Sequence, residues 1–489
     1  MKHLEFGILC LLIFCLDTHA ITFVCNGQSC NSDNIKISAN HEITIRLDEF
    51  DDHIEFKDSV IPQILRVVVS VPENINNFIA TRSAIGQIQP MAFKQLFGLY
   101  TLNLAENFLT SVDEKHFSGL TQLRWMFLSH NKISQIHPNA FKTMAELEYL
   151  NISSNQLQTL DKKVFTNLKK LEAIYLDHNR LSVLPRTIFE RNRNLRFVDV
   201  SHNQLMTFNL VFHDSLFMLN LAFNEIESFK VDFKTESRPD GDISILRLEN
   251  NHLHDISNVT SLNLSFELSL ANNLIAYHRP DSLDQLNPFD NMKNLWSLNI
   301  SNTGFHFGHV SSTNDNPFGK MSELKELDLS YNDLREINLM QIRVMELRSL
   351  QLNGNNLTEL NIAPIGRILP NLRALEISDN KFNCTYLRML MQQLNQEHHA
   401  RLEISIRDDL TVKNSTHVNG VGCIDLAARL NKASDGIFDG DKMNEHDTRL
   451  KVLEERIDDL FQKLNQALEL QQNFAKVLRN FTRTFEYGT

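Results

Sequence analysis

The chain has 489 residues, of which 42% are hydrophobic and 22% are charged, and its formal net charge is −12 at pH 7. This composition is typical of an ordered globular protein, and the lack of a basic excess argues against a nucleic-acid partner. Length alone would allow about three ordinary domains, but the repeat described below replaces that division with one continuous solenoid.

Residues 1–20 have the pattern of a secretory signal peptide. A short basic start is followed by an apolar core from Phe6 to Leu16 and by small residues before a cleavage site near Ala20. The apolar core is shorter than the ~20 residues that span a bilayer, and no longer apolar run follows. We therefore expect no membrane span and a secreted, extracellular mature chain.

The cysteines predict a cap at each end of the mature chain. Six are present, and Cys10 and Cys15 fall in the expected signal. The other four are Cys25, Cys30, Cys384 and Cys423. In an oxidising compartment, such sequence-local pairs are typical of disulfide-bonded caps. Of the three possible pairings we expect Cys25–Cys30, in a cap of residues 21–72, and Cys384–Cys423, in a cap of residues 384–431. A zinc site is the alternative, but no CxxC spacing supports it.

A repeat of the form LxxLxLxxNxL fills residues 73–383. Its asparagines recur every 24 residues at Asn107, Asn131, Asn155, Asn179 and Asn203. The pattern continues less evenly through Asn224, Asn251, Asn273, Asn332, Asn355 and Asn380, with Ser83 and Thr303 in the same slot. One such unit cannot bury its own apolar residues, so about thirteen units are expected to stack as a leucine-rich-repeat solenoid.

The repeat predicts a parallel β-sheet on the concave face and short helices and loops on the convex face. Leucines point inward, the slot asparagines bond open backbone groups as a ladder, and Phe117, Phe141, Phe165 and Phe189 fill the convex side. The residues six and four before each asparagine face outward on the concave side. Aromatic residues gather in these two columns, at Trp125, Phe127, Tyr149, Tyr175 and Phe197.

We interpret these five aromatic residues as a candidate protein-binding surface, because exposed aromatic residues are frequent interface anchors. The alternative is that they reflect only the preference of aromatic residues for strands. Glycosylation acceptors, one of them inside this surface, are predicted at Asn151, Asn258, Asn263, Asn299, Asn356, Asn383, Asn414 and Asn480.

The C-terminal residues predict a linker, 432–448, and a coiled-coil helix, 449–486. The heptad seam of that helix includes Leu450, Leu453, Ile457, Leu460 and Leu464. Its apolar face is broader than the seam of a two-stranded coil. The helix is therefore expected either to pair between chains or to pack on its own chain, and the sequence leaves both open.

No catalytic motif is present: the sequence contains no glycine-rich phosphate loop, no GxSxG and no HExxH. We expect a protein that is not an enzyme and has no cofactor. His178 and His202 precede ladder asparagines on neighbouring turns, which would place them about 5 Å apart. We interpret them as ordinary polar turn residues and predict no metal site, because no column of carboxylates or cysteines accompanies them.

The segments "FVCNGQSC" and "NKFNCTYLRMLMQQL", together with the heptad tail, resemble the mosquito leucine-rich repeat immune proteins of the haemolymph, a family that includes Plasmodium-responsive members. The resemblance covers nearly the whole chain. It implies an innate-immune binding scaffold with protein partners: another leucine-rich repeat protein and a complement-like thioester-containing protein. Longer members join two chains through further cysteines, which are missing here, so any pairing is expected to be non-covalent. The alternatives are a Toll-type or an extracellular-matrix ligand-binding module.

Overall fold

The computed structural model describes residues 20–24, 30–34, 36, 42–46, 52–69, 75–235, 242–277, 288–307, 316–360, 365–397, 403–405, 416–418 and 421–423. The chain divides into two units, residues 1–424 and 425–489, and every described residue lies in the first. Cys25, most of the expected signal peptide, the linker and the coiled-coil helix lie outside the described residues.

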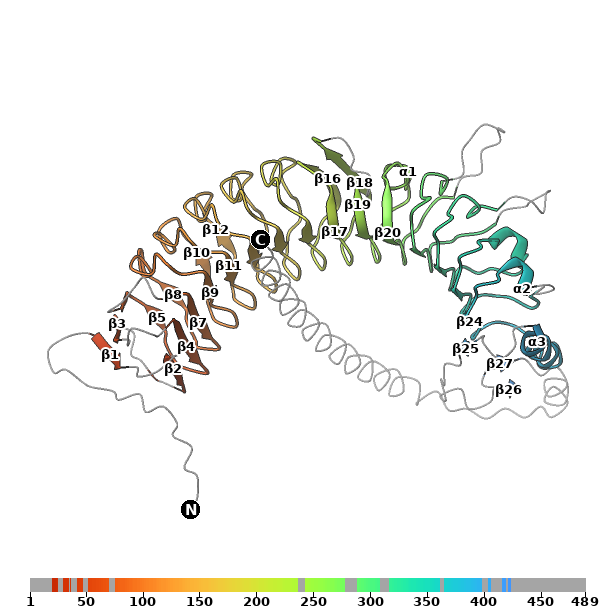
Figure 1. Cartoon of the computed structure of the whole chain (residues 1–489), viewed down its shortest axis with the longest axis horizontal. Coiled ribbons are helices and arrows are strands. Elements are labelled where there is room, and N and C mark those ends of the chain that lie inside the picture. The colour runs from red at the N-terminus through yellow and green to blue at the C-terminus, as the bar shows by residue number, and fades with distance from the viewer. Residues whose placement is uncertain are drawn as a thin grey trace, which may run out of the picture. The chain divides into compact units, whose positions relative to one another are not determined.

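A parallel sheet of 16 strands runs along the first unit and lines the inner side of its arc (Figure 1). Its strands, in spatial order, are β2 (Cys30–Asp33), β4 (His53–Lys57), β7 (Asn77–Thr81), β9 (Thr101–Asn103), β11 (Trp125–Phe127), β13 (Tyr149–Asn151), β14 (Ala173–Tyr175), β15 (Phe197–Asp199), β17 (Leu216–Asn220), β19 (Ile243–Arg247), β20 (Leu264–Ser269), β21 (Ser297–Asn299), β22 (Glu326–Asp328), β23 (Ser349–Gln351), β24 (Ala374–Glu376) and β25 (Glu403–Ser405). The spatial order is the chain order, as a leucine-rich-repeat solenoid requires, and this confirms the predicted fold class.

The sheet continues across both expected cap boundaries. β4 pairs with β7 on the N-terminal side, and β24 pairs with β25 on the C-terminal side. Strands β2 and β4 of the N-terminal cap and β25 of the C-terminal cap therefore extend the same sheet as the repeats. No described helix is long and apolar enough to cross a membrane.

The remaining elements lie outside the main sheet. They are the three-stranded sheet β1 (Ala20–Val24), β3 (Glu42–Arg46) and β6 (Val67–Val69); the pairs β5 (Gln63–Ile64) with β8 (Gln87–Ile88), β10 (Ser111–Val112) with β12 (Gln135–Ile136), β16 (Thr207–Phe212) with β18 (Ser228–Phe233), and β26 (Thr416–Val418) with β27 (Val421–Cys423); and the helices α1 (Ser257–Thr260), η2 (Leu339–Ile342), α2 (Ile365–Ile368) and α3 (Cys384–Glu397). Apart from the six-residue strands β16 and β18 and the cap helix α3, these elements have five residues or fewer, in line with the short segments predicted for the convex side.

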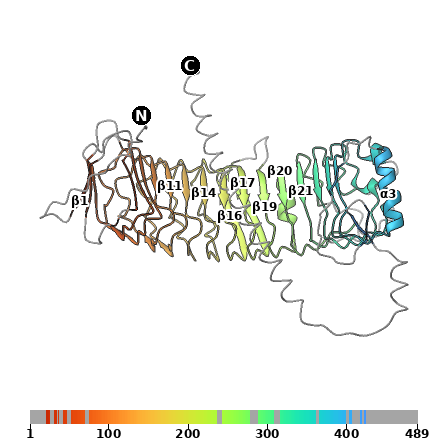
Figure 2. The same cartoon turned by 90° about the horizontal axis from the view of Figure 1, so that it is seen from below.

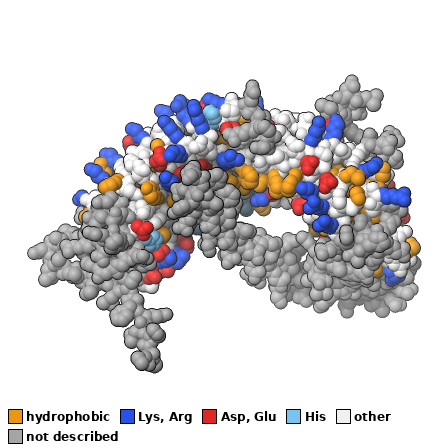
Figure 3. All heavy atoms as spheres, viewed as in Figure 1, with side chains coloured by type: hydrophobic (Ala, Val, Ile, Leu, Met, Phe, Trp, Pro, Cys, Tyr) orange, Lys and Arg blue, Asp and Glu red, His pale blue; other side chains and the backbone are white. Residues whose placement is uncertain are grey.

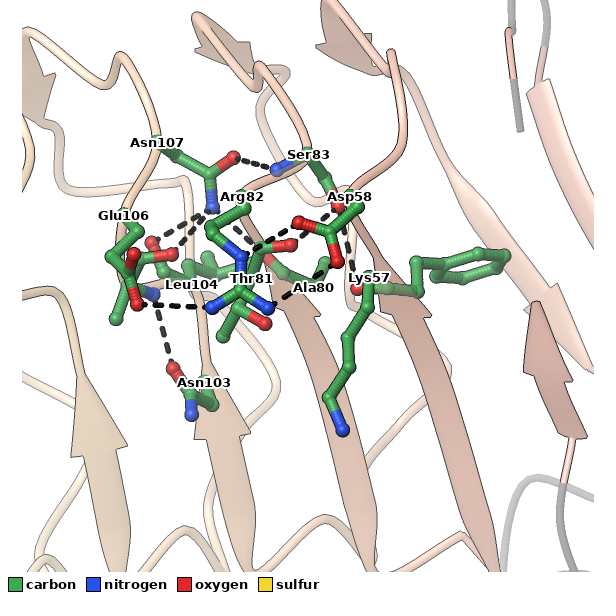
Figure 4. Close-up of polar contacts among 12 residues, drawn as sticks. Lys57, Asp58, Ala80, Thr81, Arg82, Ser83, Asn103, Leu104, Glu106 and Asn107 are labelled. Carbon is green, nitrogen blue, oxygen red and sulfur yellow. Dashed lines mark hydrogen bonds and ion pairs between the residues drawn. The ribbon is translucent and has the colours of Figure 1, made fainter. Parts of the chain in front are cut away.

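The asparagine ladder forms as predicted. Asn107 accepts a hydrogen bond at Oδ1 from the backbone N–H of Ser83 at 3.0 Å (Figure 4). The same oxygen accepts a second from the backbone N–H of Ile85, also at 3.0 Å. Its Nδ2 donates to the carbonyl of Ala80 on the preceding turn at 2.6 Å and to that of Leu104 at 3.1 Å. Because these backbone groups are buried at or just beyond the end of each strand, the amide satisfies donors and acceptors that would otherwise lack partners.

The residue before each ladder position has a left-handed backbone conformation. His130, His178 and His202 have φ values of 53°, 52° and 51°. At Gly354, with φ of 66°, an added Cβ would lie 2.3 Å from the Tyr331 ring. The strand therefore ends in a sharp turn at each repeat, and the side chain before the asparagine is displayed at the margin of the concave face.

Buried phenylalanines form the convex layer of the core. The Phe141, Phe165 and Phe189 rings stack in sequence, with centroids 6.2 and 5.7 Å apart, and Phe212 continues the row at 5.8 Å from Phe189. Aromatic stacking adds to the burial of apolar area, so successive turns stabilise one another across this layer.

Helix α3 closes the C-terminal end of the solenoid, opposite β1 (Figure 2). Leu387, Leu390, Met391 and Leu394 are buried, at the spacing of one helical face. Cys384, the first residue of α3, is disulfide-bonded to Cys423 in β27, with Cα atoms 5.0 Å apart. This is the predicted C-terminal pair. The other pair includes Cys25, which is not described.

Candidate protein-binding surface

The predicted aromatic residues lie on four adjacent strands of the concave sheet, β11, β13, β14 and β15. Each strand has three residues, of which the middle one (Met126, Leu150, Ile174 or Val198) is fully buried in the core. Because side chains alternate along a strand, the residues on either side of it face outward. The register pairs Trp125 with Tyr149, so the two outward columns are continuous across the turns.

Three of the five rings form a row. The centroid of Phe127 lies 5.1 Å from that of Tyr149, which lies 5.1 Å from that of Tyr175. Trp125 stands beside this row with 39% of its surface exposed. Phe197 belongs to a second contact, with its ring centroid 5.2 Å from that of Phe217. Ala173, which is buried, occupies the column between Tyr149 and Phe197 and separates the two groups.

Three exposed aromatic residues extend the surface beyond the predicted set. Phe217, Phe266 and Trp296 are 38%, 44% and 40% exposed, and the last two have ring centroids 5.1 Å apart. All three stand seven residues before a ladder position, one residue ahead of the columns used in the prediction. That common offset is the signal that could have identified them. Figure 3 shows a band of hydrophobic side chains along the inner side of the middle turns.

Two acidic residues lie beside the row of rings. Burial raises the pKa of Asp177 to about 7, and the charge of Asp199 on the next turn adds to this shift. Asp199 is held by hydrogen bonds to Oδ1 from the Ser201 backbone at 2.9 Å and hydroxyl at 2.7 Å, and to Oδ2 from Asn220 Nδ2 at 2.9 Å. Burial also raises the pKa of Tyr175 to about 12. The phenol therefore stays protonated and can donate a hydrogen bond at any physiological pH.

The neighbouring histidines meet as the repeat spacing predicts. The rings of His178 and His202 stack with centroids 4.1 Å apart, and Phe223 continues the stack 4.3 Å beyond His202. Among the described residues, no three His, Cys, Asp or Glu side chains form a group that could hold a metal ion. The stack adds a flat aromatic margin to the concave surface.

The predicted glycosylation acceptors that the structure describes lie in different environments. Asn151 is on β13 within the aromatic surface, where its Oδ1 accepts hydrogen bonds from Ser153 N at 2.9 Å and Oγ at 2.7 Å. Asn258 is exposed in α1, and Asn299 lies on β21. The remaining described acceptors are Asn263, Asn356 and Asn383, all half-buried, whereas Asn414 and Asn480 lie outside the described residues.

A family model described as the leucine-rich repeat matches residues 74–133, 127–181 and 170–226. No curated protein matches the sequence. The structure is similar to that of the leucine-rich repeat domain of mosquito APL1, with a TM-score of 0.59 and 20% identity over 84% of this chain and 98% of that one.

It is also similar to a structure of the mosquito LRIM1/APL1C complex, with a TM-score of 0.58 and 20% identity over 95% of this chain and 80% of that one. A leucine-rich repeat protein of Leptospira interrogans matches with a TM-score of 0.51 and 19% identity over 75% of this chain and 89% of that one. Together with the sheet, the asparagine ladder and the convex phenylalanines, these matches show that the chain has the leucine-rich repeat fold.

Proposed function

We propose that the chain is a secreted innate-immune binding scaffold, and that it binds a partner protein through the concave surface formed by Trp125, Phe127, Tyr149, Tyr175 and Phe197. One observation carries the proposal: these side chains face away from the core on adjacent strands, where Trp125 is exposed and the other four rings are half-buried. Exposed aromatic residues gain nothing in a free monomer, whereas at the centre of an interface they contribute much of the binding energy.

The solenoid fold supports a binding function rather than a catalytic one. A leucine-rich repeat solenoid presents a long, rigid concave surface, and function resides in the side chains displayed on it. Here the displayed groups are aromatic rings, phenols and carboxyl groups, which suit a protein surface with apolar and hydrogen-bonding groups.

The partners we propose are a second leucine-rich repeat protein and a complement-like thioester-containing protein. The similarity to a structure in which LRIM1 and APL1C form a complex supports the first, and the resemblance of the caps and tail to the mosquito immune family supports the second. We propose non-covalent association, because Cys384 and Cys423 are bonded to each other within the C-terminal cap. The extracellular location, in haemolymph, follows from the same resemblance and from the expected signal peptide.

The test is affinity capture of the tagged chain from its native fluid, followed by mass spectrometry of the proteins that co-purify. We expect Trp125→Ala combined with Tyr149→Ala to reduce capture of the partner at least tenfold, the scale of losing two aromatic anchors, while secretion is unchanged. A matched control is Phe108→Ala with Met206→Ala, since these apolar residues are exposed away from the concave columns. Capture of neither a thioester-containing protein nor a second repeat protein would contradict the proposed partners. If the double aromatic variant captured as much partner as the control variant does, the partner would have to bind at another surface of the chain.

A further inference from the structure

The side chains seven residues before the ladder positions form a third column at the entrance of the concave strands. In the late turns this column contains Trp296, Lys325, Arg348 and Arg373. Backbone hydrogen bonds join them in series: Lys325 donates to Trp296, Arg348 to Lys325 and Arg373 to Arg348, at 2.8, 2.7 and 2.8 Å. Three cationic residues therefore follow one another on adjacent strands, about 4.8 Å apart.

The same column is charge-compensated in the early turns. There it contains Arg124, Glu148, Glu172 and Arg196 in succession, so each arginine stands next to a glutamate, and Arg124 Nη1 lies 3.8 Å from Glu148 Oε1. Like charges directly opposite each other on adjacent strands destabilise a sheet. The run of three cations in the late turns thus costs stability, and the fold itself does not require it.

These cations lack acidic partners in the described part of the chain. Neither Arg348 nor Arg373 has a described ion pair or side-chain hydrogen bond, and both are exposed. Lys325 places its Nζ 3.3 Å from the centroid of the Trp296 ring, a cation–π contact that holds both side chains at the head of the column. Trp296 in turn contacts Phe266 and is 40% exposed.

We infer that this column, defined by Trp296, Lys325, Arg348 and Arg373, is a second docking surface, and that its occupant is an acidic segment of a partner protein with an aromatic or apolar side chain at one end. The charges are complementary to a short run of carboxylates, and two strand spacings of about 4.8 Å correspond to about three residues of extended chain at 3.3 Å each. The exposed Trp296 and Phe266 rings at the head of the column suit the apolar side chain.

The neighbouring columns disfavour a densely charged polymer. Glu326, Asp328 and Glu376 lie on β22 and β24, within three residues of Lys325 or Arg373 along the chain, and no described ion pair joins them to the cations. They would repel a chain with a sulfate or phosphate on every unit, whereas a peptide can place neutral residues there. In Figure 3, Lys and Arg side chains gather next to the hydrophobic band on the side of the later turns, with acidic side chains among them.

Trp296 provides a direct reporter, because the chain has only two tryptophans. In a Trp125→Phe background, the fluorescence of Trp296 is titrated with a tryptophan-free peptide in which one phenylalanine precedes two glutamates and one aspartate that are separated by serines. We expect saturable binding that weakens as salt is raised, and no binding of the same peptide with glutamine and asparagine instead.

Adding Arg348→Ala and Arg373→Ala should weaken peptide binding roughly tenfold and flatten its salt dependence, as expected for two solvent-exposed ion pairs. The matched control, Arg335→Ala with Arg343→Ala, removes two exposed cations from the same turns outside the column and should bind as the parent does. Arg348→Gln with Arg373→Gln repeats the test with longer side chains should the alanine variant be unstable.

Equal binding of the neutral peptide would overturn the inference, and so would an unchanged affinity in the column variant. Binding of a heparin-derived oligosaccharide without binding of the acidic peptide would overturn it in favour of a polysaccharide. The measurement needs no natural partner, so its outcome is independent of the capture experiment on the aromatic surface.

Discussion

The imidazole rings of His178 and His202 stack face to face on neighbouring turns, with centroids 4.1 Å apart and planes 10° from parallel. Burial lowers the pKa of both side chains from the usual 6.5, and each ring also lies near another histidine, His130 or its stacking partner. The stack is therefore a pair of neutral rings at neutral pH.

The histidine pair should make the fold less stable in acid. The folded state binds fewer protons here than the unfolded state, so this contribution to stability is present above the usual pKa of 6.5 and is lost as pH falls below it. We expect the melting temperature to drop between pH 7.5 and 5, and to drop less in a variant with His178→Gln and His202→Gln. An identical drop in both proteins would show that the stack does not contribute.

Asp177 should act in the opposite direction. Its folded pKa of about 7 lies above the usual 3.8, so the folded state binds more protons, and stability falls as pH rises from about 4 to about 7. Asp177→Asn removes the carboxyl group and with it this loss of stability at higher pH. It should raise the melting temperature most above pH 7, with the gain shrinking toward pH 4. Glu225→Gln, at an exposed glutamate, is the control, and a gain independent of pH would contradict the assignment.

The asparagine ladder should tolerate threonine better than alanine. Asn155 donates to the carbonyls of Leu128 and Ile152, at 2.9 and 3.1 Å, and accepts from Ile133 N at 2.9 Å. Asn155→Ala leaves these buried groups without partners and should lower the free energy of unfolding by about 3 kcal/mol. Thr303 occupies a ladder position naturally and donates to the Ile300 carbonyl at 2.8 Å. Asn155→Thr should therefore cost less in urea denaturation, and equal losses would contradict this account.

The convex phenylalanine layer should be sensitive to truncation. Phe165 is fully buried between Phe141 and Phe189. Phe165→Ala removes contacts on both neighbouring turns and leaves a cavity, so we expect a loss of about 3–5 kcal/mol in the free energy of unfolding. Phe108→Ala, where the ring is 50% exposed, should cost much less in the same measurement. Similar losses at the two positions would show that the layer is not a stabilising unit.

Asn151 should remain unglycosylated while Asn258 is modified. The side chain of Asn151, on β13, accepts two hydrogen bonds from Ser153 and lies within the aromatic surface. Asn258, in contrast, is exposed in α1. Deglycosylation of the secreted protein in ¹⁸O water followed by peptide mapping should label Asn258 and not Asn151. A label at Asn151 would place a glycan inside the aromatic surface and contradict its use as an interface.

The fixed phase of the repeat made the sheet, the ladder and the outward columns predictable from sequence. Each leucine and asparagine has one role at each turn, so Trp125 and Tyr149 could be placed on the concave side without coordinates. Phe217, Phe266 and Trp296 escaped the prediction because they stand one residue before the outward positions of the template, at a position to which the template assigns no direction.

The long convex strands β16 and β18 were also not predicted. The spacing from Asn203 to Asn224 is 21 instead of 24, and the segments after these asparagines pair over six residues. Phe208 stacks on Phe229 with centroids 5.9 Å apart, which joins these two turns on the convex side. A template with a fixed period of 24 residues gives no structural meaning to a shortened turn. Here the shortened turn lies between β16 and β18, which form a separate two-stranded sheet.

The ladder bond keeps the same geometry while the chain between its partners changes in length. The amide of Asn224 reaches a carbonyl 24 residues earlier, that of Asn131 one 27 residues earlier, and that of Asn332 one 32 residues earlier. The corresponding distances are 3.1, 2.9 and 2.9 Å. The ladder hydrogen bond therefore joins one turn to the preceding turn whatever the number of residues between them. Segments on the outer side can be lengthened, shortened or exchanged without disturbing the strand register, so this architecture can diversify its loops for new partners while its concave surface stays in place.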